Sequence, residues 1–166
     1  MTKKLGLPQF AAVLLLSFGL NAFADKTYDA QFLDKMTEHH RQGVEMAKLA
    51  KDKAENTELK KMSDKMIKDQ NKEISQMEKW RKSDFAKEPH ATDMPPAMDM
   101  EPLKTASGAS FDHQFIEMMS KHHDDGIKMA KDAESKASTG KVRTFAKNVA
   151  KNQSMEKEKM SKLHTA

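Results

Sequence analysis

The chain contains one helical segment twice, and this repeat constrains its fold more than any other feature. FLDKMTEHHRQGVEMAKLA at residues 32–50 returns as FIEMMSKHHDDGIKMAKDA at residues 115–133. The spacing that relates these two segments continues without a gap, and it pairs Gln70 with Gln153, Glu73 with Glu156 and Met77 with Met160. A single helical hairpin can bury only part of its apolar face, so the duplication predicts two hairpins that pack together.

Helix boundaries can be predicted from capping residues and from the 3.6-residue apolar period. The first helix is expected from about Thr27 to Ala54, and Asn56 and Thr57 offer a cap for a second helix that opens at Glu58. Ser110 is expected to cap a third helix that runs to about Ala137. Residues 138–140 then turn into a fourth helix that ends near 164. The predicted fold class is therefore all-α, a four-helix bundle built from two duplicated helical hairpins with a long crossover linker.

The first 24 residues resemble a secretory signal peptide. Lys3 and Lys4 precede an apolar run, and small residues follow it, so we expect cleavage near Ala24 and a periplasmic or secreted protein. No later stretch has the ~20 apolar residues of a membrane span. Residues 25–166 are then a single four-helix-bundle domain, with repeat one at 27–82, the linker at 83–110 and repeat two at 111–164.

The amino-acid composition limits the kinds of molecule that the protein is expected to bind. Acidic and basic residues are interleaved, and no basic block is backed by aromatic residues, so nucleic acid is not an expected partner. The chain has no Cys but 14 Met. Unbranched Met can simply fill a helical core, but its thioether is also the soft metal ligand left to an exported protein without Cys.

Polar residues recur at the middle of the apolar faces. When the two helices of a hairpin are folded against each other at their turn, His39 and His40 lie level with Gln70 and Glu73. On one side of this level, Met46 lies opposite Met62 and Met66. On the other side, Met36 lies opposite Ile74 and Met77. The second copy repeats this with His122, His123, Gln153, Met155 and Glu156. A buried carboxylate costs several kcal/mol unless it is paired or bound to a cation.

Two interpretations of this layer stay open: hydrogen bonds that fix the register of the bundle, or a metal site. Paired His flanked by Met favours metal. Gly43 and Gly126, each within a helix, suggest that space is needed beside the His pairs, although close helix packing alone would explain them. The candidate metal ligands are Met36, His39, His40, Met46, Met66, Gln70, Glu73, Met77, Met119, His122, His123, Met129, Gln153, Glu156 and Met160.

The linker offers a second candidate. Its Pro and Gly residues exclude a continuous helix, and it contains soft ligands close together in sequence. One interpretation is a mobile Pro-rich connection that simply tolerates Met. The alternative is an accessory metal site formed by His90, Met94, Met98 and Met100.

The pattern FLDKMxxHHxxGVEMA followed by MIKDQNKEISQMEKW resembles the domain of unknown function 305 family, whose members are ferritin-like helical bundles with this His-His and Gln-x-x-Glu signature. The resemblance covers nearly all of the chain after the signal peptide, in two copies. It implies a ferritin-like fold, and the Met content best suits a periplasmic copper-binding member. The second copy departs from the pattern at Lys157, and Leu163 stands in the place of Trp80, which implies a looser or differently selective site.

These observations favour an exported protein that binds copper, as Cu(I), for sequestration, transfer or tolerance. Its expected partners are the metal ion and other exported copper-handling proteins. One alternative is a structural or stress-responsive bundle whose His–Gln–Glu layer binds no metal, and another is an enzyme that uses Zn or Fe. Di-iron bundles use Glu-x-x-His pairs, which this chain lacks, and it has no nucleophile or nucleotide-binding motif. We therefore expect no enzymatic activity.

Overall fold

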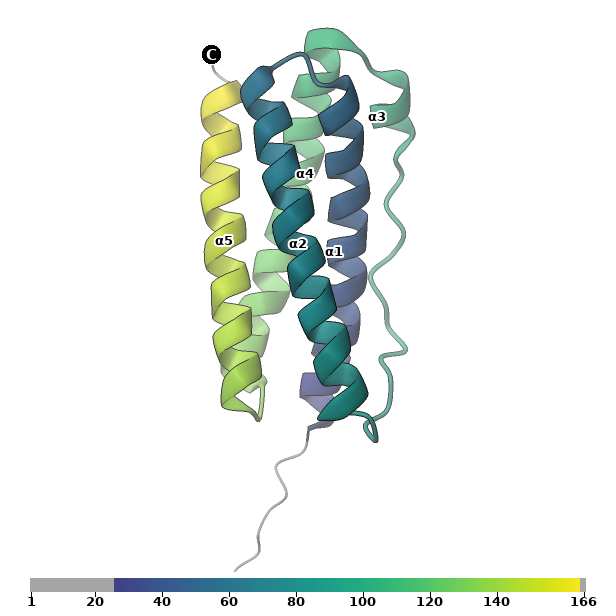
Figure 1. Ribbon diagram of the computed structural model, residues 1–166, viewed down its shortest axis with the longest axis vertical. Coiled ribbons are helices and arrows are strands. Elements are labelled where there is room, and N and C mark those ends of the chain that lie inside the picture. The colour runs from purple at the N-terminus through teal and green to yellow at the C-terminus, as the bar shows by residue number, and fades with distance from the viewer. Residues whose placement is uncertain (1–25, 165–166) are drawn as a thin grey trace, which may run out of the picture.

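The computed structural model describes residues 26–164, so the predicted signal peptide and its cleavage site lie outside the described residues. Four long helices run along one another, α1 (Thr27–Lys53), α2 (Thr57–Ser83), α4 (Gly108–Lys136) and α5 (Gly140–His164) (Figure 1). A short helix, α3 (Glu101–Thr105), interrupts the linker. The predicted all-α bundle of two hairpins, α1–α2 and α4–α5, is confirmed; α3 was not predicted.

The caps explain where the helices begin. The Asn56 side chain accepts hydrogen bonds from the backbone N–H groups of Glu58 and Leu59, at 2.9 and 3.2 Å, as predicted. The prediction for Ser110 is wrong, because α4 already begins at Gly108. There the Phe111 N–H donates to the Ser107 carbonyl at 3.2 Å, and Gly108 takes a φ of 57°, which glycine adopts without strain.

Each hairpin holds the turn of the other through an aspartate. Asp29, at the start of α1, is fully buried and accepts hydrogen bonds from the N–H groups of Ser138 and Thr139 and from the Thr139 hydroxyl, at 2.6 to 2.9 Å. Its repeat partner Asp112 accepts from the N–H groups at 55 and 56 in the α1–α2 turn, at 3.0 and 2.7 Å. The two hairpins are therefore related by an approximate twofold axis.

The apolar core is divided into two clusters. The Phe32 cluster joins the start of α1 and the end of α2 to the end of α4 and the start of α5, and includes Phe32, Leu33, Phe85, Ala133 and Val142. The Phe115 cluster lies toward the other end of the bundle and includes Ala47, Leu59, Leu103, Phe111 and Phe115. Between the hairpins, α1 packs against α4, whereas α2 and α5 barely touch.

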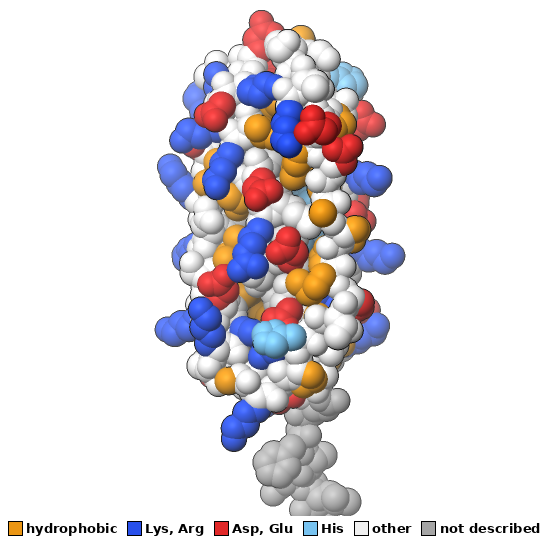
Figure 2. Space-filling view, turned by 90° about the vertical axis from the view of Figure 1, so that its right-hand side faces the viewer, with side chains coloured by type: hydrophobic (Ala, Val, Ile, Leu, Met, Phe, Trp, Pro, Cys, Tyr) orange, Lys and Arg blue, Asp and Glu red, His pale blue; other side chains and the backbone are white. Residues whose placement is uncertain are grey.

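The linker runs along the bundle beside α1 and is anchored at several points (Figure 1). Arg81 donates to Asp34 at 3.0 Å and to the carbonyls of Phe85 and Glu88, and Gln42 donates to the Pro96 carbonyl at 3.1 Å. Leu103 of α3 is fully buried. Figure 2 shows the face that the linker covers, where acidic and basic side chains are interspersed and hydrophobic side chains are scattered in small groups.

Candidate metal centre

A layer of polar side chains occupies the middle of the bundle, where the two apolar clusters leave space. Its members are His39, His40, Gln70, Glu73, His122, His123, Gln153 and Glu156, which we call the polar layer. Each of the four His and both Gln is at most 3% exposed. The sequence predicted this layer, and the structure brings together the residues of both hairpins.

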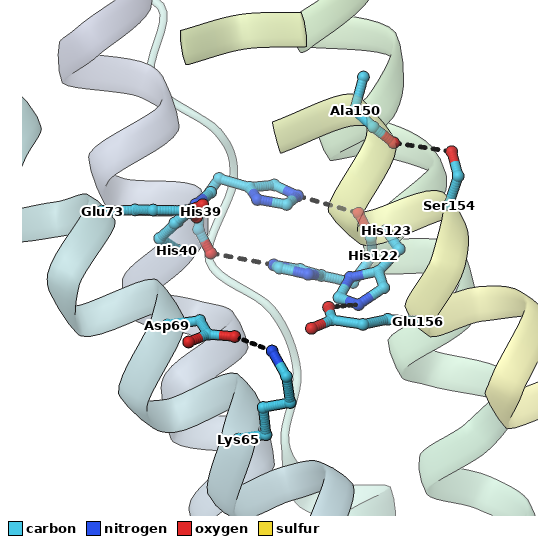
Figure 3. Close-up of polar contacts among 10 residues, drawn as sticks. All are labelled: His39, His40, Lys65, Asp69, Glu73, His122, His123, Ala150, Ser154 and Glu156. Atoms are coloured by element: carbon cyan, nitrogen blue, oxygen red, sulfur yellow. Dashed lines mark hydrogen bonds and ion pairs between the residues drawn. The ribbon is translucent and has the colours of Figure 1, made fainter. Parts of the chain in front are cut away.

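His39 and His122 meet at the centre of the layer. Their rings stack with centroids 3.7 Å apart and planes 18° from parallel. The Nε2 atom of His39 donates to the His122 carbonyl at 2.9 Å, and the Nε2 atom of His122 donates to the His39 carbonyl at 3.0 Å (Figure 3). Because a carbonyl can only accept, each ring carries its proton on Nε2 and leaves Nδ1 for another partner.

The other two histidines are held by carboxylates of their own hairpins. His40 Nε2 donates to Glu73 at 2.7 Å, and His123 Nε2 donates to Glu156 at 2.9 Å. A His that binds metal through one ring nitrogen commonly donates its other N–H to a carboxylate or a backbone carbonyl. Glu73 and Glu156 are thus placed to orient the histidines, a different role from the direct ligation that the sequence suggested.

The layer contains most of the unpartnered polar atoms of the described chain. Nine buried side-chain N and O atoms of residues 26–164 have no hydrogen-bond partner, and all but Ser138 Oγ belong to this layer. They are the Nδ1 atoms of the four histidines and both amide atoms of Gln70 and Gln153. Burying such atoms unpaired is costly, so their concentration here indicates a place that receives a ligand.

Burial keeps the two central imidazoles neutral. The pKa of His39 is lowered to about 4 and that of His122 to about 2, chiefly because burial disfavours the charged ring; the neighbouring histidines add to both shifts. A metal must compete with protons for an imidazole, and these low values reduce that competition at neutral pH.

Two glycines make room for this arrangement. A Cβ at Gly43 would lie 2.6 Å from Gln70 Oε1 and 3.0 Å from His122 Cε1. A Cβ at Gly126 would lie 2.6 Å from His39 Cε1 and closer still to Gln153 Oε1. Of the two explanations for these glycines, the structure therefore favours space beside the His pairs.

The predicted thioether ligands flank the polar layer on both sides. Met36, Met77 and Met129 belong to the Phe32 cluster, and Met46, Met66, Met119 and Met160 belong to the Phe115 cluster. All except the half-buried Met129 are at most 1% exposed. Each cluster contains methionines of both hairpins, because the approximate twofold axis brings the two hairpins together. Matching residues within a single hairpin does not predict this mixing. Their packing also fits the simpler role of core filling.

The polar layer approaches the surface between α2 and α5. Glu73 and Glu156 keep 20% and 17% of their side chains exposed. Glu156 lines a cleft of about 60 Å³ together with Met62, Lys65, Asn152, Met155 and Lys159. Figure 3 shows Lys65, which is paired with Asp69, next to the layer.

The predicted accessory residues are divided between two places. His90 donates from Nδ1 to Asp34 at 2.9 Å and lines a surface groove together with Met94. Met98 and Met100 pack on the Phe115 cluster instead. The structure therefore does not bring these four side chains to one point.

Carboxylates and histidines alone do not form a metal site here. Within residues 26–164, no group of three or more His, Cys, Asp or Glu side chains is placed to hold an ion. A metal at the polar layer would therefore need amide or thioether donors as well.

Within residues 26–164, every helix is too short or too polar to cross a bilayer.

The family model for the domain of unknown function 305 (DUF305) matches residues 29–164. The chain belongs to this family. Among solved structures, a DUF305 protein of Streptomyces coelicolor, provisionally described as secreted, is 26% identical with a TM-score of 0.75, and the match covers 83% of this chain and 91% of that one. No curated protein matches the chain.

Structures of the protein CopM are also similar to this DUF305 chain. CopM in its Cu(II)-bound form is 31% identical with a TM-score of 0.74, and CopM in its Cu(I)-bound form is 32% identical with a TM-score of 0.73. Each match covers 82% of this chain and 95% of CopM. CopM has also been solved with Ag bound.

Proposed function

We propose that this protein binds copper after export and serves in copper sequestration, transfer or tolerance, without catalysing a reaction. The observation that carries the proposal is the concentration of unpartnered His and Gln atoms in one buried layer that lies between two clusters of methionines. Imidazole and thioether together suit copper, and Met selects the Cu(I) state. The similarity to CopM, which has been solved with copper bound, supports the same choice.

The harder-ion alternative has less support. Zn and Fe sites in enzymes draw on His with Asp or Glu, and both layer carboxylates already accept hydrogen bonds from histidines. The metal-free alternative is favoured by one observation: His39 and His122 satisfy each other's Nε2 atoms and so could fix the register of the bundle alone. That role leaves the eight other polar atoms of the layer without partners.

Parallel titrations with Cu(I) and Zn(II), each against a competing chelator, test the proposal. The wild-type protein should retain Cu(I) and lose Zn(II). A variant with Met46, Met66, Met119 and Met160 replaced by Leu preserves core volume, and it should bind Cu(I) at least tenfold more weakly. Met155→Leu is the matched control, because Met155 is 45% exposed, and it should leave affinity unchanged. Tight Zn(II) binding with negligible Cu(I) retention would favour the harder-ion alternative, and binding of neither ion would favour the register role.

A further inference from the structure

Charge is distributed unevenly over the folded bundle, although acidic and basic residues are interleaved along the sequence. Helices α2 and α5 together contain 15 Lys or Arg and 7 Asp or Glu. Helices α1 and α4 with residues 84–107 contain 11 Lys or Arg and 16 Asp or Glu. Because α2 and α5 lie side by side (Figure 1), the fold gathers a net positive charge on one side of the molecule.

Every carboxylate of α2 and α5 already has a partner. Asp64 and Glu78 pair with basic residues of α1, at 2.8 and 2.7 Å. Glu73 and Glu156 accept hydrogen bonds from histidines of the polar layer. The remaining three pair with lysines of their own helices, Glu58 with Lys61, Asp69 with Lys65 and Glu158 with Lys162. The surplus positive charge of these two helices is therefore carried by other lysines.

Five exposed lysines of α2 and α5 that form no ion pair within residues 26–164 share one side of the bundle. We call this set the lysine face, and its members are Lys68, Lys72, Lys79, Lys151 and Lys159. The spacings of four and seven residues put the three lysines of α2 in one row, and a spacing of eight does the same for the two of α5. Lys159 lines the cleft between the two helices together with Lys65, so the two rows are neighbours.

The lysine face offers mobile charges and few groups suited to a specific protein partner. Met155, which is 45% exposed, lies one helical turn from both Lys151 and Lys159. No aromatic side chain of residues 26–164 is largely exposed. Trp80 and Phe145 instead pack edge to face between α2 and α5, with ring centroids 5.6 Å apart.

This composition favours a lipid surface over a protein partner. The centres of protein interfaces are depleted of Lys and enriched in Arg, Tyr and Trp. The Lys ammonium is a hydrated point charge on a flexible stem, and it does not require a partner of fixed geometry. Each Lys held near an anionic bilayer strengthens binding by about fivefold, so five of them suffice for reversible attachment.

We propose that the lysine face is a docking surface for an anionic phospholipid bilayer, on which the bundle lies with α2 and α5 along the membrane. Attachment is electrostatic and involves no insertion of a helix. The more acidic side, formed by α1, α4 and the linker, then faces the solution. This inference goes beyond copper binding and does not depend on it.

Two variants of equal charge test the proposal. The lysine-face variant is Lys68→Gln/Lys72→Gln/Lys79→Gln/Lys151→Gln/Lys159→Gln. The control variant replaces five exposed lysines elsewhere that also form no ion pair within the described chain, Lys48→Gln/Lys87→Gln/Lys121→Gln/Lys128→Gln/Lys131→Gln. Each variant loses five positive charges, so the two have the same net charge. All proteins begin at residue 25, because the apolar segment before it would itself bind lipid; every described helix is retained.

The readout is co-sedimentation with vesicles of phosphatidylglycerol and phosphatidylcholine, and with vesicles of phosphatidylcholine alone. The unsubstituted protein should bind only the anionic vesicles and should be released as salt screens its exposed charges. The lysine-face variant should bind at least about a hundredfold more weakly, whereas the control variant should lose less than about tenfold. Equal losses in the two variants would overturn the proposal, because net charge alone would then explain binding.

Two further measurements complete the test. If the unsubstituted protein binds no anionic vesicles, the proposal is wrong and an acidic protein becomes the partner to seek. Should the fivefold substitution disturb the helical circular dichroism spectrum, Lys72→Gln/Lys151→Gln replaces it, with an expected loss of about 25-fold and Lys48→Gln/Lys128→Gln as its control. Both fivefold variants should keep the Cu(I) affinity of the unsubstituted protein, so failure of lipid binding and failure of the proposed copper function are distinguishable.

Discussion

At the scale of single residues, hydrogen bonds at Nε2 decide which histidine atoms remain for a ligand. All four rings donate from Nε2, to a backbone carbonyl or to a carboxylate, and all four Nδ1 atoms are left buried and unpartnered. The sequence predicts which histidines are buried. It cannot predict the tautomer, because that depends on where the partners lie in three dimensions.

Substitution of Gly126 by Ala tests the close packing of the layer. Within a helix this change normally stabilises by up to about 1 kcal/mol. Here the new Cβ would press on His39 and Gln153, so we expect a loss of about 1–3 kcal/mol in the free energy of unfolding. Urea denaturation measures it. Gly140→Ala is the control, since the nearest atom to a Cβ there is Arg143 Nη2 at 3.8 Å, and it should not destabilise. A more stable Gly126→Ala protein would contradict the observed packing.

The lowered pKa values predict that stability falls in mild acid. In the unfolded chain His39 takes up a proton near its ordinary pKa of 6.5, whereas in the folded protein it stays neutral down to about 4. The unfolded state then binds more protons as pH falls through 6.5, which favours unfolding. Between pH 7 and pH 5 we expect a loss of about 2 kcal/mol from His39, and His122 adds to it in the same direction.

Urea denaturation at several pH values with a chelator present checks this expectation. The window lies above the ordinary carboxyl range, so Asp and Glu contribute little to the slope. His39→Gln/His122→Gln is the comparison, and its stability should depend much less on pH. Equal slopes for the two proteins would show that the central histidines do not titrate as burial predicts.

At the scale of the elements, the repeat predicted the long helices well and their contacts less well. Apolar periodicity and the Asn56 cap predicted the boundaries of α1 and α2 to within a few residues. The start of α4 was missed because Gly108 extends the helix before Ser110, and a left-handed glycine is not visible in a sequence. The pairing of His39 with Gln153 was missed because it needs the twofold axis between hairpins, which periodicity within one hairpin does not specify.

Asp29 should contribute more to stability than its place in a first helical turn suggests. It satisfies two backbone N–H groups and a hydroxyl of the opposite turn in a fully buried position. We expect Asp29→Ala to cost about 1–3 kcal/mol in unfolding free energy, measured by thermal or urea denaturation. Asp52→Ala, at an exposed position near the end of α1, should change stability by less than about 0.5 kcal/mol. Similar effects of the two substitutions would disprove a structural role for the crossed contact.

The linker belongs to the fold, as one residue can demonstrate. Leu103 of α3 is fully buried in the Phe115 cluster, so Leu103→Ala should cost about 2–5 kcal/mol. Met94→Ala, in the same linker but 42% exposed, should have little effect on the urea midpoint. If both substitutions were neutral, the linker would be only a connection.

At the scale of the whole molecule, the polar layer joins two hairpins that otherwise meet mainly along α1 and α4. A metal held by both hairpins must be released before either can separate, so its binding energy adds to the stability of the entire bundle. A metal held within one hairpin would instead protect that hairpin alone. This difference can be measured without any knowledge of the ligand geometry.

We therefore expect Cu(I) bound at the polar layer to stabilise both hairpins together. At a free concentration 100 times the dissociation constant, a single site should raise the free energy of unfolding by about 2.7 kcal/mol. Hydrogen exchange should slow by a similar factor at buried amides of α2 and of α5, although these helices barely touch each other. The His39→Ala/His122→Ala variant removes both central histidines of the polar layer, and its exchange should not respond to Cu(I). Protection confined to one hairpin of the wild-type protein would mean that the metal lies within that hairpin, and the polar layer would then not link the two halves through a shared ion.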